Sequence, residues 1–223
     1  MRTFAILLAI LFSCQSWSDE CDRLPKPSVT VKRFEEPFVL DTNYGYKEIA
    51  HLGEALARPG RQILGLTRVK AIARFAINTS LYVDRTGRWE CASPQITVTY
   101  GFSPMTVYVA KEFPEGSCAY REIYKHELRH VQIYRSHLAS IEKGLLDTLN
   151  SRFATEGPWR GPAGQTQSRL QQELNDRWLP YIQQEINRGE AAQAHIDTAE
   201  EYARVADSCN GEIKKRIDAF ERR

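Results

Sequence analysis

The sequence predicts an α+β fold in which a small antiparallel sheet is followed by three long helices. Residues 63–111 alternate apolar and polar side chains and are rich in β-branched residues, a pattern typical of strands. Residues 117–150 have instead the pattern of one long helix, and two more helical stretches follow it. Strands therefore come first along the chain and helices later, which is the order of an α+β domain.

Residues 1–18 have the features of a signal peptide. A basic start is followed by an apolar run that ends at Phe12, and this run is shorter than the about 20 residues that span a bilayer. Small residues follow, and we expect cleavage after Ser18, so that the mature chain begins at Asp19 and is periplasmic or secreted. An alternative is a lipoprotein signal with Cys14 lipidated, against which the bulky Phe12 counts.

Residues 19–223 are enough for a single compact domain with a real core. We expect residues 19–115 to be mainly β and residues 116–223 to be mainly α. In the first part the patterns predict a strand at 29–32, a short helix at 46–58 that Pro59 and Gly60 close, a strand at 66–75, and a hairpin whose strands 96–100 and 105–110 flank a turn at 101–104.

The helical part begins at a good N-cap residue, Ser117. Residues 151–164 contain three glycines and two prolines and are expected to form a loop. A second helix is expected to start near residue 166 and to reach the region of Arg188. The segment from Asp197 to Glu200 has the form of a capping box, which predicts a third helix from Thr198 to about residue 220.

The cysteines also favour export. Without Cys14 an even number remains, as suits an oxidising compartment. Four cysteines allow three pairings, and the sequence does not choose among them. We expect a Cys91–Cys118 bond inside the central region and a Cys21–Cys209 bond that joins the two ends of the mature chain.

The charge pattern argues against nucleic acid as a partner. The net charge is +2, and the basic residues are scattered among acidic ones with no basic stripe that is interleaved with aromatic residues. After the start of the chain no apolar stretch is long enough to span a membrane, so no membrane span is expected. The oligomeric state stays open.

One motif in the long helix carries chemistry: His126-Glu127-Leu128-Arg129-His130. Histidines four residues apart lie on one face of a helix, so their ring nitrogens can reach one zinc ion about 2 Å from each. Glu127 lies beside the first histidine and can take a proton from a water whose pKa a metal has lowered. His126 and His130 are therefore the candidate metal ligands, and Glu127 is the candidate catalytic base.

A site of this kind needs a third protein ligand, with one position left for water. Glu201 is expected to supply it, from the first turn of the third helix, and the rivals are His195, Glu185 and Asp197. His137 is on nearly the same helix face as His130, but seven residues of helix advance about 10 Å, too far to share one ion. The choice among the later residues stays open.

The stretch from Cys118 to Val131, which contains the motif, resembles secreted bacterial zincin-like (HExxH) proteins of unknown function. The segment from Ile196 to Arg204 resembles a stretch that recurs near the end of such proteins. The resemblance implies zinc, a proteolytic ancestry and a fold that joins a small sheet, the HExxH helix and further long helices. It also implies an edge strand above the metal, for which Met105–Ala110 is the candidate. Arg129 departs from the uncharged residues that are usual between the glutamate and the second histidine.

These features predict a secreted zinc-dependent hydrolase that cleaves peptide bonds, with Glu127 as general base. Its substrate would be a protein or a peptide, which includes the peptide part of cell wall. The alternative is a non-catalytic zincin-fold envelope protein that works as a binding module and has a structural or vestigial metal site. Arg129 favours this alternative, because a buried guanidinium close to zinc would oppose a second positive charge.

Overall fold

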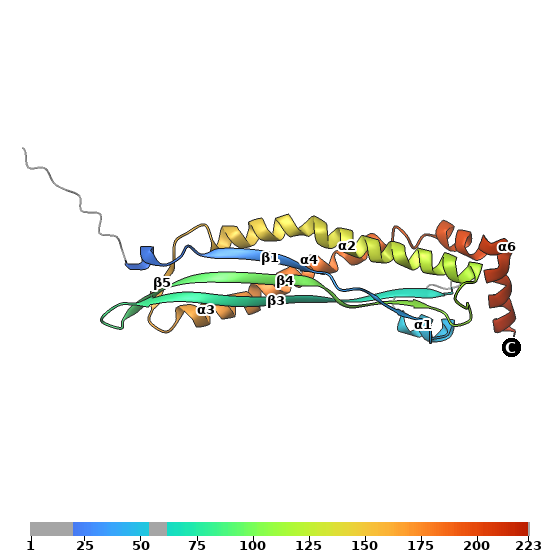
Figure 1. The fold of residues 1–223 in the computed structure, drawn as a ribbon, viewed down its shortest axis with the longest axis horizontal. Helices are drawn as coiled ribbons and strands as arrows, with labels where there is room; N and C mark the ends of the chain where they lie inside the picture. The colour runs from blue at the N-terminus through green and yellow to red at the C-terminus, as the bar shows by residue number, and fades with distance from the viewer. Residues whose placement is uncertain (1–19, 54–61, 223) are drawn as a thin grey trace, which may run out of the picture.

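A computed structural model of the chain describes residues 20–53 and 62–222. The molecule is elongated, with long strands on one side and helices along the other (Figure 1). The proposed signal peptide and the second half of the helix expected at 46–58 lie outside the described residues.

A five-stranded mixed sheet forms around one long central strand, β4. Strands β1 and β2 pair with β4 in parallel, whereas β3 and β5 pair with it antiparallel. The strands are β1 (Ser28–Phe34), β2 (Val39–Asp41), β3 (Gly65–Val83), β4 (Trp89–Val109) and β5 (Trp159–Pro162). The α+β class is therefore confirmed, and the expectation of a purely antiparallel sheet is wrong.

The hairpin also lies elsewhere than the sequence predicts. Residues 96–109 do not fold back on themselves but belong to the single strand β4. A turn at Asp84–Trp89 connects β4 to its antiparallel partner β3. The expected turn contains Pro104, which has no N–H for a sheet ladder. Ser103 and Pro104 together lie opposite the single residue Lys70, and this bulge accommodates the proline without ending the strand.

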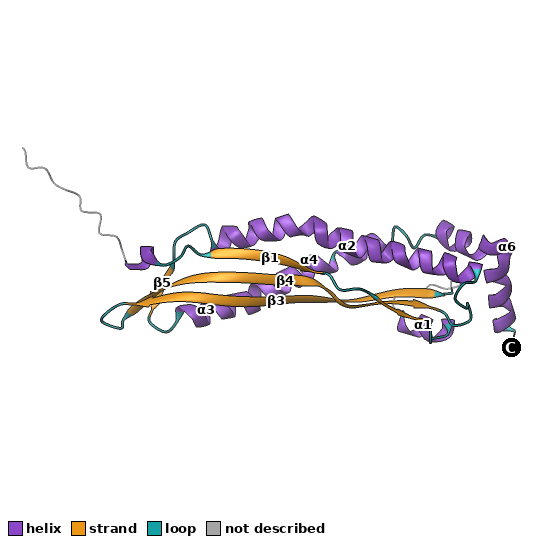
Figure 2. Ribbon diagram, viewed as in Figure 1, coloured by secondary structure: helices purple, strands orange, loops and turns teal. Residues whose placement is uncertain are grey.

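Helices pack on only one face of the strands along most of the sheet (Figure 2). Alternate residues of β4, namely Ile96, Val98, Tyr100 and Phe102, are buried in a core with the apolar faces of the helices. The helical elements are η1 (Glu20–Arg23), α1 (Tyr46–Leu52), α2 (Cys118–Phe153), α3 (Thr166–Glu173), the π-helical η3 (Leu174–Trp178), α4 (Leu179–Asn187), α5 (Gly189–Gln193) and α6 (Ala199–Glu221). No helix in the described ranges is long and apolar enough to cross a membrane.

The helical part follows the sequence closely. α2 begins after Ser117, whose side chain accepts a hydrogen bond from the backbone N–H of Tyr120 at 3.1 Å. The second helical stretch consists of α3, η3 and α4 in succession, and the third is α6. The expected loop after α2 contains the short strand β5, which pairs with the start of β4.

A second apolar cluster lies at the opposite end of the molecule from the β3–β4 turn. It joins α1, the start of β3, the end of β4, the start of α2 and the last part of α6 (Figure 1). Its buried members include Ile49, Leu66, Val109, Ile123 and Ile217. These elements surround the motif helix at the level of His126, so this cluster holds the walls of the candidate site in place.

Two disulfides form, but with a pairing other than the expected one. Cys21 bonds to Cys91, and Cys118 bonds to Cys209. Cys91 and Cys118 cannot meet because β4 runs between them, and its residues 91–109 span about 60 Å when extended. Two disulfides are what an oxidising, extracytoplasmic environment permits.

Candidate metal centre

The motif residues lie on the face of α2 that turns toward β3 and the segment between α5 and α6. Glu127 and His130 are buried, and the His126 side chain is 11% exposed. Each of the three offers one ligand atom, and these atoms all lie within 4.8 Å of one another. The group formed by His126, Glu127 and His130 could therefore hold a metal ion.

Asp197 completes a triangle of donor atoms with the two histidines. The Nε2 atoms of His126 and His130 are 3.2 Å apart, and Oδ1 of Asp197 is 3.2 Å from each of them. Two ligands of a tetrahedral ion with bonds of about 2.0–2.1 Å lie about 3.3–3.4 Å apart. The three donors thus fit three corners of a zinc tetrahedron, with the fourth corner left for water or substrate.

Glu201, which the sequence favoured as third ligand, lies on the other side of the His126 ring. Its Oε1 is 3.3 Å from Nδ1 of His126, whereas Nε2 of that ring faces Asp197. One carboxylate in this position cannot share an ion with the Nε2 atoms. Its Oε1 also accepts hydrogen bonds from Arg129 at 2.7 Å and from Arg204 at 2.9 Å.

The position of the N-cap of α6 explains why Asp197, and not Glu201, faces the Nε2 atoms of the histidines. The N-cap of α6 is Thr198, whose hydroxyl accepts a hydrogen bond from the backbone N–H of Glu201 at 3.2 Å. The expected capping box placed the cap one residue earlier, at Asp197. Because Thr198 caps the helix instead, the Asp197 carboxylate turns toward the histidines, and Glu201 lies in the first turn beside Arg129.

The other rivals lie away from the triangle. His195 is exposed on the turn before α6. The Glu185 carboxylate pairs with Arg188 at 2.8 Å. His137 contacts the backbone carbonyl of Glu185 through Nε2 at 2.7 Å, so it joins α2 to α4 and does not reach the motif.

Each histidine contacts a side chain through the ring nitrogen that does not face the triangle. Nδ1 of His130 lies 2.7 Å from Oε1 of Gln193, a residue of α5 that is only 8% exposed. Nδ1 of His126 contacts Glu201. Partners of this kind fix the tautomer and the orientation of a ligating imidazole, so that Nε2 keeps its lone pair for a metal.

Strand β3 positions Glu127. The hydroxyl of Thr67 donates to Oε2 of Glu127 at 2.9 Å. Gly65 contacts the same side chain so closely that a Cβ added to the glycine would come within 2.7 Å of Oε1. The start of β3 is therefore the strand that lies against the motif, and the expectation that Met105–Ala110 would do so is wrong. Met105 and Val109 are buried in β4, one strand further in.

The electrostatics of the site reflect burial and mutual contact. Burial raises the pKa of the Glu127 carboxyl, although the two histidines and Thr67 act in the opposite direction. Burial alone would lower the pKa of His130, but the hydrogen bond with Asp197 and the charge of Glu127 outweigh it, and the pKa is raised. Burial also acts to raise the pKa of Asp197, yet hydrogen bonds with both histidines hold it well below its usual range. A metal ion bound by these residues would compete with a proton for the ring nitrogen of His130.

No protein-family model, no curated protein and no solved structure matches the chain. The likeness of the motif helix to zincin-like proteins thus stays an expectation.

A cavity of about 600 Å³ opens beside the triangle. One part of its wall consists of the motif residues and Asp197. Another part is apolar and comes from α1, the residues just before β3, β3 itself, α2 and α6, with Leu52, Ile63, Leu66, Ile123, Val205 and Ile217. Two tyrosines, Tyr134 and Tyr202, also line the cavity. Burial, together with the nearby carboxylates of Glu190, Asp197 and Glu127, raises the pKa of Tyr134 to about 12, so its hydroxyl keeps its proton at neutral pH.

Sequence reasoning missed three residues of this site. Gly65, Thr67 and Gln193 are common residue types outside any motif, and only the packing of β3 and α5 on α2 gives them a role. Arg129, by contrast, was recognisable from the sequence as a charged residue at a motif position that is usually uncharged. It pairs with Glu201 and its side chain is 42% exposed, so its charge is balanced and stays outside the triangle.

Proposed function

We propose that this protein is a zinc-dependent hydrolase of peptide bonds. The observation that supports this function best is the triangle of His126, His130 and Asp197 donors beside the buried carboxylate of Glu127. Zinc in such a site supplies a water of lowered pKa and a Lewis acid for a carbonyl oxygen. A donor set of two imidazoles and one carboxylate suits this metal.

In this mechanism Glu127 is the group that moves protons. Its burial and raised pKa make it a better base toward a water proton than an exposed carboxylate, and Thr67 holds it in place through one oxygen. The other oxygen, Oε1, takes the proton from the attacking water and delivers it to the leaving amine. Two tyrosines in the cavity, Tyr134 and Tyr202, would donate to the oxygen that gains charge, and the raised pKa of Tyr134 keeps its hydroxyl protonated at neutral pH.

The substrate would be an extended peptide bound along β3. In the described part of the chain β3 pairs with β4 on one edge only, and no strand covers its other edge. An extended chain can add to such an edge through backbone hydrogen bonds. Residues 65–69 of this strand line the cavity, so a peptide there would pass the triangle and place an apolar side chain against Leu66, Ile123 and Val205.

Hydrolysis of a quenched-fluorescent peptide library by the zinc-loaded protein tests this function. Glu127→Gln keeps the size of the side chain and removes the base, so it is expected to lower kcat by at least about 10³-fold without loss of zinc. Glu185→Gln, a change of the same kind away from the site, is the matched control and should leave kcat unaltered. Binding of zinc without cleavage of any peptide by the wild-type protein would contradict the proposal and leave a binding protein with a structural metal.

A further inference from the structure

The second face of the sheet has its own surface chemistry. Helices pack on the face of β4 that carries Ile96 and Val98, whereas the opposite face is open, and Figure 2 shows the strands in front of α3 and α4. Most residues that the strand register places on this open face are polar or basic: Ser28, Thr30 and Lys32 of β1, Arg68, Lys70, Arg74 and Asn78 of β3, and Gln95, Thr97 and Thr99 of β4. Phe34 of β1 and Ile72 and Ala76 of β3 lie on the same face, and the acidic Asp41 lies at its end, opposite Tyr108. We call this set the open face.

Four cations of the open face have no partner among the described residues. Lys32, Arg68, Lys70 and Arg74 are all exposed, and no carboxylate in the described ranges forms an ion pair with any of them. Some arginines on the helices are paired, as Arg152 is with Glu173. The open face thus has a group of four unpaired cations on a molecule whose net charge is only +2.

The register of the strands places these cations near one another on the open face. Lys32 and Arg74 lie opposite the same residue of β4, Thr99, so they stand two strand spacings apart, about 10 Å. Lys70 and Arg68 extend this group along β3.

Exposed apolar side chains lie in the same layer. Among the described residues, all the large hydrophobic side chains that are exposed belong to the sheet or its connections: Val39, Leu40, Tyr44, Leu81, Val83 and Trp89. Val39, which is 58% exposed, lies opposite Thr106, and Thr106 lies opposite Arg68. Leu81, Val83 and Trp89 flank the turn between β3 and β4.

We propose that the open face docks on the surface of a lipid bilayer that contains anionic phospholipids. Phosphate groups at a bilayer surface would pair with the unpaired cations. Val39 and Trp89, which are exposed and in register with the same face, would enter the interface, where aromatic and aliphatic residues are favoured. Cations spread over two strand spacings fit a broad anionic surface.

The strength of this binding follows from the charges. Each cation at an anionic surface strengthens binding about five-fold, so loss of all four is expected to weaken it by several hundred-fold. Salt screens exposed charges over a Debye length of about 10 Å at 0.1 M, so the binding should fall steeply as ionic strength rises.

Vesicle flotation of the disulfide-bonded protein tests this proposal. The probes are phosphatidylcholine vesicles with and without phosphatidylglycerol, each at low and high salt. One variant, K32Q/R68Q/K70Q/R74Q, removes the four cations of the open face. The control, K47Q/K143Q/K214Q/K215Q, removes the same charge from α1, α2 and α6. Circular dichroism and thermal melting of both variants check that they fold.

The expected result is flotation only with the anionic vesicles and at low salt, lost in the open-face variant and kept in the control. Absence of flotation by the wild-type protein, or equal loss in both variants, would overturn the proposal. So would tight binding to double-stranded DNA without binding to vesicles, since this would make a nucleic acid the partner. Zinc binding and hydrolysis of soluble peptides are measured without vesicles, so this proposal and the proposed function fail independently.

Discussion

At the scale of single residues, a glycine decides whether Glu127 can sit where it does. Gly65 begins β3 directly against α2, and a Cβ there would come within 2.7 Å of Glu127 Oε1 and 2.8 Å of Ile123 Cγ2. Both atoms belong to side chains of a well-packed helix. A methyl group at residue 65 would therefore displace the carboxylate from the position that Thr67 fixes.

Gly65→Ala is expected to lower kcat at least about ten-fold, because a displacement of the order of 1 Å in a catalytic group costs this much or more. Zinc content should stay at the wild-type level, since none of the three donor atoms contacts Gly65. Peptide hydrolysis and zinc content measured on the same preparation check both statements. Gly157→Ala, at a glycine with open space around its Cβ position, is the matched control. Unaltered hydrolysis in Gly65→Ala would show that Glu127 is not held as described.

Glu90 shows how a single carboxylate can join two elements. It is 3% exposed in β4 and accepts hydrogen bonds from the backbone N–H groups of Gly164 and Thr166 and from the Thr166 hydroxyl. These bonds, first of all the one from the hydroxyl, lower the pKa of Glu90 below its ordinary value of 4.5. Glu90 therefore ties the start of α3 to the sheet.

A lowered pKa in the folded state gives stability that is present above the unfolded pKa and is lost as the pH falls through the folded pKa. Glu90→Gln is expected to lower the free energy of unfolding by about 2 kcal/mol at neutral pH, since bonds to a charged acceptor are the stronger ones. This difference should shrink as the pH falls below about 4.5. Urea unfolding of both proteins at a series of pH values is the measurement, and a difference that grows toward low pH would contradict this role.

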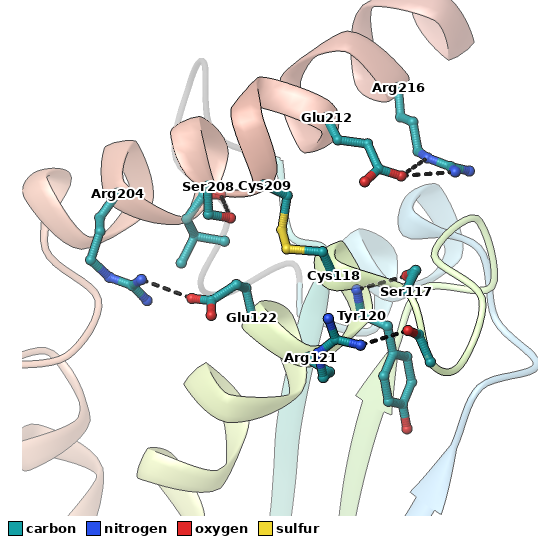
Figure 3. Close-up of a disulfide and its surroundings, with 12 residues drawn as sticks. Ser117, Cys118, Tyr120, Arg121, Glu122, Arg204, Ser208, Cys209, Glu212 and Arg216 are labelled. Atoms are coloured by element: carbon teal, nitrogen blue, oxygen red, sulfur yellow. Dashed lines mark hydrogen bonds and ion pairs between the residues drawn. A yellow bond between two sulfur atoms is a disulfide. The ribbon is translucent and has the colours of Figure 1, made fainter.

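At the scale of elements, α6 matters most, because its first half forms a wall of the cavity and follows directly after Asp197. The helix breaks at Ser208–Gly211, where Cys209, Asn210 and Gly211 have positive φ. Figure 3 shows how this first half is tied to α2: Cys209 bonds to Cys118, and Arg204 donates to Glu122 at 2.9 Å. The disulfide thus holds in place the segment that supplies the third donor.

The two disulfides should differ in their effect on zinc. Loss of either bond is expected to lower the free energy of unfolding by about 2–4 kcal/mol, since both close long loops, of 70 and 91 residues. Only C118S/C209S should also weaken zinc binding, because Cys21 and Cys91 lie at the far end of the sheet. Competition with a zinc chelator at a temperature where both double variants are folded measures this. Equal zinc affinity in the two variants would show that α6 holds its place without the bond.

At the scale of the whole molecule, the elements predicted from the sequence are largely present, but their pairing is not as predicted. The helix after Ser117 and the strand at 29–32 were visible as local patterns of caps and apolar side chains. The pairing of the strands depends on residues far apart in the sequence. Pro104 predicts a turn because proline has no N–H for the sheet ladder, yet a bulge opposite Lys70 accommodates this proline within β4. The length of the undivided strand β4 then decides which cysteines meet.

The residues of the candidate site also fall into a part that local sequence predicts and a part that it does not. His126, Glu127 and His130 follow from helix geometry alone, so the motif was sufficient to find them. The third donor depends on where α6 begins. Because the cap is Thr198 and not Asp197, Asp197 becomes the third donor and Glu201 becomes the residue that orients His126. No sequence pattern fixes a cap to a single residue when two good cap residues are adjacent.

We propose that His126, His130 and Asp197 hold one zinc ion and that Glu201 lies outside its ligand set. The most direct test is the zinc affinity of four proteins by chelator competition: wild type, D197N, E201Q and the control E185Q. We expect one zinc per wild-type chain, almost none in D197N, a 10–100-fold weaker affinity in E201Q, as for residues that orient a ligand, and no change in E185Q. Full zinc occupancy in D197N together with loss of zinc in E201Q would contradict this ligand set and make Glu201 the third ligand.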